Sequence, residues 1–261
     1  MHPRTLVVIP TYNEAQNVLG LAADVLKQDP CLELLVVDDA SPDGTGDVVE
    51  EARRTEPRLH LLRRAGKLGI GSAYLAGFRY GIERGFEQIF TMDGDRSHDP
   101  VYLPALLAAL READMVIGSR YCAGGGVANW RRDRQVLSRF ANWYTRALLR
   151  LPIHDCTSGY RGYRREVLQH VDAFSVRGSG YSFLEETAWR VHQAGFRIAE
   201  VPIVFTDRSA GVSKIDQSEI LKAAWHVLAT ALRPPRIAAA RSARREAEAG
   251  AIPEPAGEAK P

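Results

Sequence analysis

An apolar run that ends in two closely spaced acids lies in the middle of the chain: Gln88-Ile89-Phe90-Thr91-Met92-Asp93-Gly94-Asp95-Arg96-Ser97-His98-Asp99-Pro100. The first five residues have the length and character of a buried strand. Residues i and i+2 of an extended chain project from the same side, so Asp93 and Asp95 can converge on one divalent cation. Ligands of α/β sheets bind at the carboxyl ends of strands, where this pair stands. The stretch predicts a sheet strand followed by a metal site, although Asp-x-Asp spacing alone is common in loops.

Short apolar runs alternate with longer amphipathic segments on both sides of this stretch. The expected strands are Thr5–Pro10, Leu32–Val37, Leu59–Leu62, Gln88–Met92 and Met115–Gly118. The expected helices are a first one capped by Asn13 and ending near Gln28, and then about 46–55, 70–84 and 102–112. This alternation predicts an α/β fold with a mostly parallel central sheet and helices on both faces.

The second half of the chain is less regular. It predicts helices over about 135–149, 184–194 and 217–232, and a strand over 198–205. Residues 236–261 are rich in Ala, Arg, Glu and Pro, which is typical of a disordered tail.

Charge is unevenly distributed along the 261 residues. The net charge is only +2, yet the segment 120–165 holds ten arginines against Asp133 and Asp155, about +8, which leaves about −6 elsewhere. Such a block suits phosphates, anionic lipid head groups or nucleic acid, or it is a solvated arginine-rich surface.

Targeting and redox signals are weak. The three cysteines, Cys31, Cys122 and Cys156, are widely spaced, match no metal-ligand pattern and favour a reducing compartment. The first apolar run, Leu6–Ile9, already has the character of a core strand, so we expect no signal peptide. Apolar stretches stay well short of ~20 residues, so we expect no transmembrane helix.

Six segments in order resemble the family-2 glycosyltransferases, and within them the dolichol-phosphate and polyprenol-phosphate mannose synthases. They are Val8–Glu14, Val36–Thr45, Met92–Pro100, Gly118–Tyr121, Asp155–Arg161 and the pair Arg208 and Ser213-Lys214. Two positions depart from the family pattern, because Gly94 and Arg96 stand where Ala and Leu are more usual. Glycine lets the backbone approach closely, and Arg96 is expected to face solvent or pair with an acid.

The resemblance implies a single-domain A-type glycosyltransferase fold over residues 1–235, with a donor half of about 1–120 and an acceptor half of about 121–235. It implies that Asp93, Asp95 and Arg120 are catalytic. Asp95 would ligate Mg²⁺ or Mn²⁺, with Ser97 or a water completing the shell. The donor would contact Pro10, Tyr12, Glu14, Val37, Asp39, Asp93, Gly94, Asp95, Arg120, Arg208 and Lys214.

The resemblance also implies that Arg134 and Ser138 bind the acceptor phosphate. Residues four apart on a helix face one way, and a guanidinium can hold two phosphate oxygens, so both residue types suit this role. Simpler interpretations stay open. Tyr12 and Glu14 suit a helix entry, Asp38 suits the cap of the Ser41–Gly44 turn, and the segment 208–214 suits a surface turn as well as a mobile lid. His98 suits a supporting role.

The implied activity is inverting transfer of mannose from GDP-mannose to a polyprenyl or dolichyl monophosphate at the cytoplasmic face of the membrane, where a membrane-anchored partner protein is also expected. A UDP-sugar-dependent transferase is the alternative, and Glu185 or Glu186 would then supply the base that a polysaccharide acceptor needs. A nucleotide or nucleic-acid binding module is the non-enzymatic alternative. It predicts salt-dependent nucleic-acid binding and leaves Asp93 and Asp95 without a role, so we expect no nucleic-acid partner.

Overall fold

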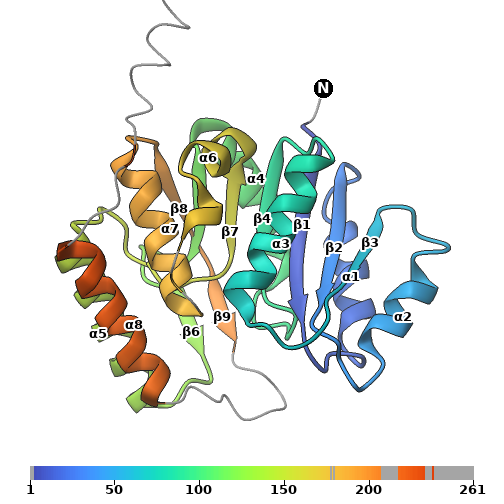
Figure 1. The fold of residues 1–261 in the computed structure, drawn as a ribbon, viewed down its shortest axis with the longest axis horizontal. Coiled ribbons are helices and arrows are strands. Elements are labelled where there is room, and N and C mark those ends of the chain that lie inside the picture. Colours follow the sequence, from blue (N-terminus) through green and yellow to red (C-terminus); the bar gives the residue numbers. More distant parts are fainter. Residues whose placement is uncertain (1–2, 177, 179, 207–216, 233–236, 238–261) are drawn as a thin grey trace, which may run out of the picture.

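A seven-stranded sheet forms the centre of the molecule (Figure 1). The computed structural model describes residues 3–176, 178, 180–206, 217–232 and 237. Along the sheet the strands are β3 (Leu59–Arg63), β2 (Leu32–Asp38), β1 (Thr5–Thr11), β4 (Gln88–Thr91), β7 (Arg161–Arg164), β5 (Met115–Ser119) and β8 (Ile198–Pro202). All neighbours are parallel except β7, which is antiparallel to both β4 and β5. The prediction of a mostly parallel sheet is therefore confirmed, and strands from both halves of the chain share it.

Helices cover both faces of the sheet, as the alternating pattern predicts. The main helices are α1 (Val18–Leu26), α2 (Thr45–Ala52), α3 (Ile70–Glu83), α4 (Leu103–Glu112), α5 (Arg132–Leu149), α6 (Arg165–His170), α7 (Tyr181–Gln193) and α8 (Gln217–Leu232), with 3-10 turns η1 (Pro100–Tyr102) and η2 (Ala173–Ser175). The buried side chains form two cores. One joins α3, α6 and α7 to one face of the sheet, and the other joins α1, α2 and α4 to the opposite face.

Helices α5 and α8 pack against each other at one end of the sheet, beyond β8 and α7 (Figure 1). A small second sheet pairs β6 (Gly126–Ala128) with β9 (Val204–Thr206). None of the helices in the described ranges is both long and apolar enough to span a membrane.

The first helix begins later than predicted. Asn13 is not its cap, because Asn13 has a left-handed φ of 62° and α1 starts at Val18. The amides of residues 13, 14 and 15 donate instead to the side chains of Ser41, Thr45 and Asp43. These bonds tie residues 13–15 to the turn after β2.

The expected strand 198–205 is two strands. Pro202 ends β8 because proline has no N–H to donate to a ladder, and β9 then pairs with β6 in the second sheet. The antiparallel strand β7 was not predicted. Its Gly162 faces the ring of Phe90, where an added Cβ would lie 2.3 Å from the nearest ring carbon, so only glycine fits. The predicted tail lies outside the described residues apart from Ile237.

Candidate active site

One cavity of about 760 Å³ runs from the carboxyl ends of β1, β2 and β4 to the space between α5, α7 and α8. Its polar end is lined by residues from the loops after these strands: Pro10, Tyr12, Glu14, Asp39, Asp93, Gly94, Asp95 and His98. Its other end is mainly apolar and is lined by Leu137, Phe140, Ala141, Tyr144, Leu184, Ile220, Ala223, Ala224 and Val227. Between them lie Arg120, Arg134, Ser138, Thr157 and Ser158.

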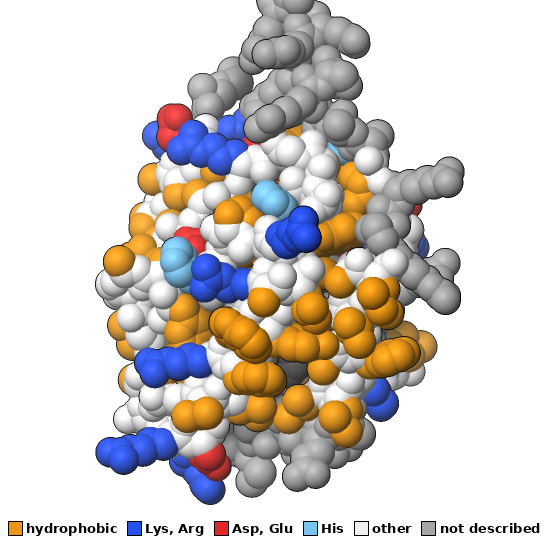
Figure 2. Space-filling view, turned by 90° about the vertical axis from the view of Figure 1, so that its left-hand side faces the viewer, with side chains coloured by type: hydrophobic (Ala, Val, Ile, Leu, Met, Phe, Trp, Pro, Cys, Tyr) orange, Lys and Arg blue, Asp and Glu red, His pale blue; other side chains and the backbone are white. Residues whose placement is uncertain are grey.

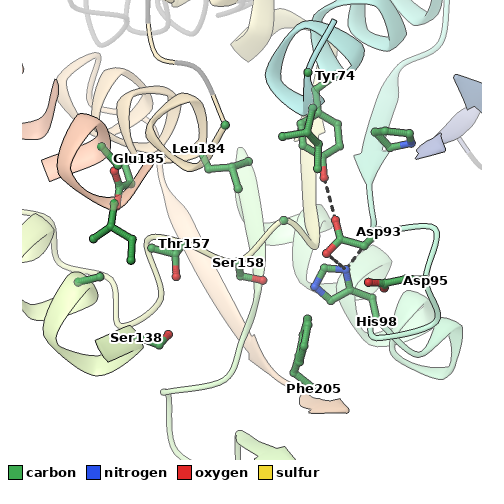
Figure 3. A pocket seen from close by; sticks show the side chains of 18 of the residues that line it. Tyr74, Asp93, Asp95, His98, Ser138, Thr157, Ser158, Leu184, Glu185 and Phe205 are labelled. Carbon is green, nitrogen blue, oxygen red and sulfur yellow. Dashed lines mark hydrogen bonds and ion pairs between the residues drawn. The ribbon is translucent and has the colours of Figure 1, made fainter. Parts of the chain in front are cut away.

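Asp93 and Asp95 both line the polar end, directly after β4 (Figure 3). Oδ1 of Asp95 accepts from the amide of Ser97 at 3.0 Å and from its hydroxyl at 2.5 Å. Asp93 accepts a hydrogen bond from the Tyr74 hydroxyl at 3.1 Å. The loop thus fixes both carboxylates at the rim of the sheet, as their spacing predicts.

His98 supports this loop from within the protein. Its Nδ1 lies 3.0 Å from the backbone nitrogen of Asp93, which donates to it, and 3.6 Å from Asp93 Oδ2. Burial lowers the pKa of His98, although the charge of Asp93 acts in the opposite direction. A neutral ring can accept the Asp93 amide at Nδ1, so the expected supporting role agrees with the geometry.

Tyr12 and Glu14 line the polar end of the cavity and lie before the first helix, which starts at Val18. The ammonium group of Lys67 lies over the Tyr12 ring, 4.3 Å from the ring centroid. Asp39 pairs with Arg64 at 2.8 Å and accepts the amide of Leu68 at 3.1 Å. These contacts connect the loop after β2 to the entry of α3, where Gly69 and Ile70 also line the cavity.

Two predicted residues do not line the cavity. Val37 is fully buried in the core, and Ser97 is buried with its hydroxyl on Asp95. Asp38 serves the fold: its carboxylate accepts from the amide and the hydroxyl of Ser41. Its capping of the turn is thereby confirmed.

Gly94 and Arg96, the two unusual positions, have clear structural reasons. A Cβ at Gly94 would lie 3.1 Å from the Pro10 carbonyl oxygen, so glycine permits the close approach of the two loops. Arg96 pairs with Asp24 of α1 at 3.0 Å and is exposed, so the expected acid partner is present.

Arg120 lines the cavity but is held by a buried carboxylate. Its Nε and Nη2 each lie 2.7 Å from an oxygen of Asp155, and Nη2 also donates to Thr157 at 2.6 Å. Burial alone would raise the pKa of Asp155, but the charge and hydrogen bonds of Arg120 outweigh it and hold this pKa below its ordinary value. Asp155 therefore fixes Arg120 at the centre of the cavity.

Arg134 and Ser138 lie one turn apart on α5, and both line the cavity. The Arg134 guanidinium lies 4.1 Å from the centroid of the Trp130 ring. The Ser138 hydroxyl accepts from the Tyr121 hydroxyl at 2.7 Å. Arg161 and Arg164 of the arginine block instead donate to buried backbone carbonyls and serve the fold. Arg208 and Lys214 lie outside the described residues.

Several lining residues carry no recognisable sequence signal. Tyr74 and Lys67 lie on or before α3 and have the pattern of an ordinary amphipathic segment. Of the two acids at the start of α7, Glu185 faces the cavity, whereas Glu186 pairs with Arg190 and His226, each at 2.7 Å. Sequence alone does not separate these neighbours.

Comparison with known proteins decides the family. The profile of glycosyl transferase family 2 matches residues 6–172. The chain belongs to glycosyltransferase family 2. It is 48% identical over 232 residues to the polyprenol monophosphomannose synthase of Mycolicibacterium smegmatis, covering 88% of each chain. It is 44% identical over 215 residues to the undecaprenyl-phosphate mannosyltransferase of Micrococcus luteus, covering 81% of this chain and 87% of that one.

Solved structures of glycosyltransferases share the fold. A mannosyltransferase of Pyrobaculum calidifontis, in complex with GDP-Man and Mn²⁺, superposes with a TM-score of 0.59 at 22% identity, over 91% of this chain and 66% of its own length. Glucosyl-3-phosphoglycerate synthase of Mycobacterium tuberculosis, in complex with Mn²⁺, UDP and glucosyl-3-phosphoglycerate, superposes with a TM-score of 0.61 at 19% identity. This match covers 88% of this chain and 79% of that one. The predicted family and A-type fold are confirmed.

Asp93 and Asp95 suit a divalent cation that is coordinated by the protein and by substrate phosphates together. No group of three or more His, Cys, Asp or Glu side chains within the described ranges could hold a metal alone. Mg²⁺ is commonly bound by one or two carboxylates together with substrate phosphates rather than by an all-protein cage. Asp93 and Asp95, adjacent on the cavity wall, are a donor set of that kind.

Proposed function

We propose that this chain transfers mannose from GDP-mannose to a polyprenyl monophosphate and inverts the anomeric centre. The observation that carries the proposal is the continuous cavity, which joins a carboxylate pair at the sheet edge to an apolar channel between α5 and α8. A nucleotide-sugar needs the first part, and a lipid chain needs the second. The names of the two relatives above 40% identity support both substrates.

The donor would lie at the polar end. Tyr12 offers a flat face to the base, and the carboxylates of Glu14 and Asp39 accept hydrogen bonds from base amines or ribose hydroxyls. Asp93 and Asp95 would hold the cation against the diphosphate, with the backbone of Gly94 close by. A bound Mg²⁺ or Mn²⁺ would neutralise the charge that develops on the leaving nucleoside diphosphate.

The acceptor phosphate would lie between the two ends. Arg134 and Ser138 line this part from α5, and Arg120 faces it from the end of β5. A phosphate monoester has a second pKa of about 6, so it is already anionic near neutral pH and attacks without a strong base. The tasks of the protein are then alignment, charge neutralisation and support of the leaving group.

The lipid would reach the cavity from a membrane surface. Large exposed apolar side chains of α5 and α8 gather on one side of the molecule (Figure 2), and we name this set the apolar face: Val136, Phe140, Trp143, Leu221 and Trp225. Contiguous exposed apolar side chains of this kind suit a membrane interface. We infer peripheral attachment to the cytoplasmic leaflet through this face; a membrane-anchored partner stays a prediction.

The direct test supplies the purified chain with Mn²⁺, vesicles that contain polyprenyl phosphate, and either labelled GDP-mannose or labelled UDP-glucose. We expect label from GDP-mannose to enter the organic phase and unlabelled GDP to compete. Label from UDP-glucose alone would replace the proposal by the UDP-sugar alternative. No transfer from either donor would refute both.

A further inference from the structure

Glu185 is the most unusual side chain in the apolar part of the cavity. It comes from the second turn of α7, is 4% exposed and lines the channel together with Leu184 (Figure 3). Its Oε1 accepts from the Thr145 hydroxyl at 3.0 Å, whereas its Oε2 is buried and has no hydrogen-bond partner. A buried carboxylate oxygen without a partner is costly, so the site favours the neutral acid.

The position of Glu185 relates it to the lipid rather than to the sugar. Its partner Thr145 lies seven residues after Ser138 on α5, which is about 10 Å along the helix. In Figure 3 Glu185 lies at the far end of the cavity from Asp93 and Asp95. A prenyl chain that leaves a phosphate at Arg134 and Ser138 and runs between α5 and α8 passes over Glu185.

Charged and titratable groups near Glu185 come from three directions. The charges of Arg161 on β7 and His226 on α8 stabilise the ionised form of Glu185 and lower its pKa. Cys156, on the loop before β7, is also close enough for the charge of Glu185 to raise its pKa. Arg161 is occupied by the carbonyls of Cys156, Ser158 and Leu184, and His226 lies 2.7 Å from Glu186. Burial outweighs these charges and the Thr145 hydrogen bond, and it raises the pKa of Glu185 to about 7.

We propose that Glu185 is a proton-linked specificity residue of the lipid channel, which admits the prenyl chain only while its carboxyl group is neutral. The inference rests on the proposed function. Glu185 already has almost no contact with solvent, and an apolar chain packed along this part of the cavity makes the surroundings of its carboxyl group still less polar. Binding of the lipid therefore takes up a proton when Glu185 is ionised beforehand. A dianionic phosphate about two turns away adds repulsion to the ionised form.

The linkage fixes the sign of the pH dependence. Below pH 7 Glu185 is mostly neutral and the channel can bind the lipid. Above pH 7 each further unit of pH weakens acceptor binding by up to about tenfold. From pH 6 to pH 8.5 the KM for the lipid acceptor should rise about 30-fold, while the KM for the donor should not follow this change.

The test compares the full chain with Glu185→Gln, which keeps a side-chain oxygen for Thr145 but cannot ionise. Acceptor and donor KM are measured from pH 6 to 8.5 with polyprenyl phosphate in detergent. The phosphate of the acceptor titrates equally with both proteins, so the ratio of the two acceptor KM values isolates Glu185. Glu112→Gln, an exposed change on α4, is the matched control and should keep the wild-type profile.

We expect the wild-type acceptor KM to rise about 30-fold relative to that of Glu185→Gln over this range. Calorimetry in two buffers of different ionisation enthalpy should show, at pH 7.5, that the wild type takes up about 0.8 proton more than the variant on binding lipid. Parallel KM profiles, or a loss of kcat in the variant at every pH with unchanged acceptor KM, would overturn the proposal. Absence of mannose transfer by the wild type would instead refute the proposed function.

Discussion

At the scale of single residues, the two acids after β4 are held in place by their neighbours. The Asp95 carboxylate is oriented by Ser97, and Asp93 by Tyr74 and by the loop that His98 supports. Both acids line the cavity. This fixed placement would favour cation binding, because a cation that also binds a diphosphate needs carboxylate oxygens that are already in position.

Replacement of Asp95 by Asn tests this role. The amide keeps the size of the side chain but removes its charge, so we expect kcat to fall at least about 100-fold, or about 2.7 kcal/mol of transition-state stabilisation. Circular dichroism and the Tm should stay close to those of the wild type. Asp99→Asn is the matched control, because Asp99 is exposed, caps η1 and does not line the cavity. Near-normal turnover of Asp95→Asn with metal present would count against the proposed role.

At the scale of elements, α7 carries a buried acid that makes stability depend on pH. The pKa of Glu185 is raised from 4.5 to about 7, so the folded state binds more protons than the unfolded state between these values. Its contribution is fully present below pH 4.5 and is lost as pH rises through 7. The loss approaches the order of 3 kcal/mol above pH 8.

We therefore expect Glu185→Gln to gain stability relative to the wild type as pH rises from 5 to 8.5. Urea denaturation at several pH values in the absence of lipid measures this difference directly. A constant difference between the two proteins across this range would mean that Glu185 is not buried as an acid in solution.

Helices α5 and α8 present the apolar face, and its removal should separate membrane binding from chemistry. The double change Leu221→Glu and Trp225→Glu alters exposed side chains that do not line the cavity. We expect partition onto vesicles to fall about tenfold or more, with little change in GDP binding. The control Leu19→Glu with Val101→Glu adds equal charge to exposed apolar positions on α1 and η1. Equal losses in both double variants would contradict a specific docking face.

Sequence predicts these elements unevenly, for physical reasons. Strands β1, β2, β4 and β5 and the helix α3 follow from apolar periodicity, and Gly85 ends α3 with a left-handed φ of 77° as its place predicts. The start of α1 does not follow, because three amides of residues 13–15 are satisfied by side chains about 30 residues later. Strand β7 was missed because its place between β4 and β5 depends on tertiary pairing.

The site divides in the same way. Asp93, Asp95, Arg134 and Ser138 line the cavity as their motifs predict, but the buried pair of Arg120 with Asp155 depends on contacts across 35 residues. Glu185 and Glu186 are neighbours in sequence with opposite surroundings. A helical position turns by about 100° per residue, so only the packing of α7 decides which acid enters the channel.

At the scale of the whole molecule, one sheet holds Asp93 and Asp95, and the paired helices α5 and α8 at its end line the apolar part of the cavity, which we propose as the lipid channel. The cavity runs through both regions, so the two proposed substrates could meet without a large rearrangement of the described parts. The central claim is that the acids at the sheet edge bind the donor diphosphate through a cation.

Calorimetric titration of GDP, with and without Mn²⁺, into the wild type and into Asp95→Asn tests that claim most directly. We predict tight binding of GDP to the wild type only with Mn²⁺, and a loss of this metal dependence in Asp95→Asn. Equal GDP affinity with and without Mn²⁺ in the wild type, or an unchanged metal effect in the variant, would contradict it.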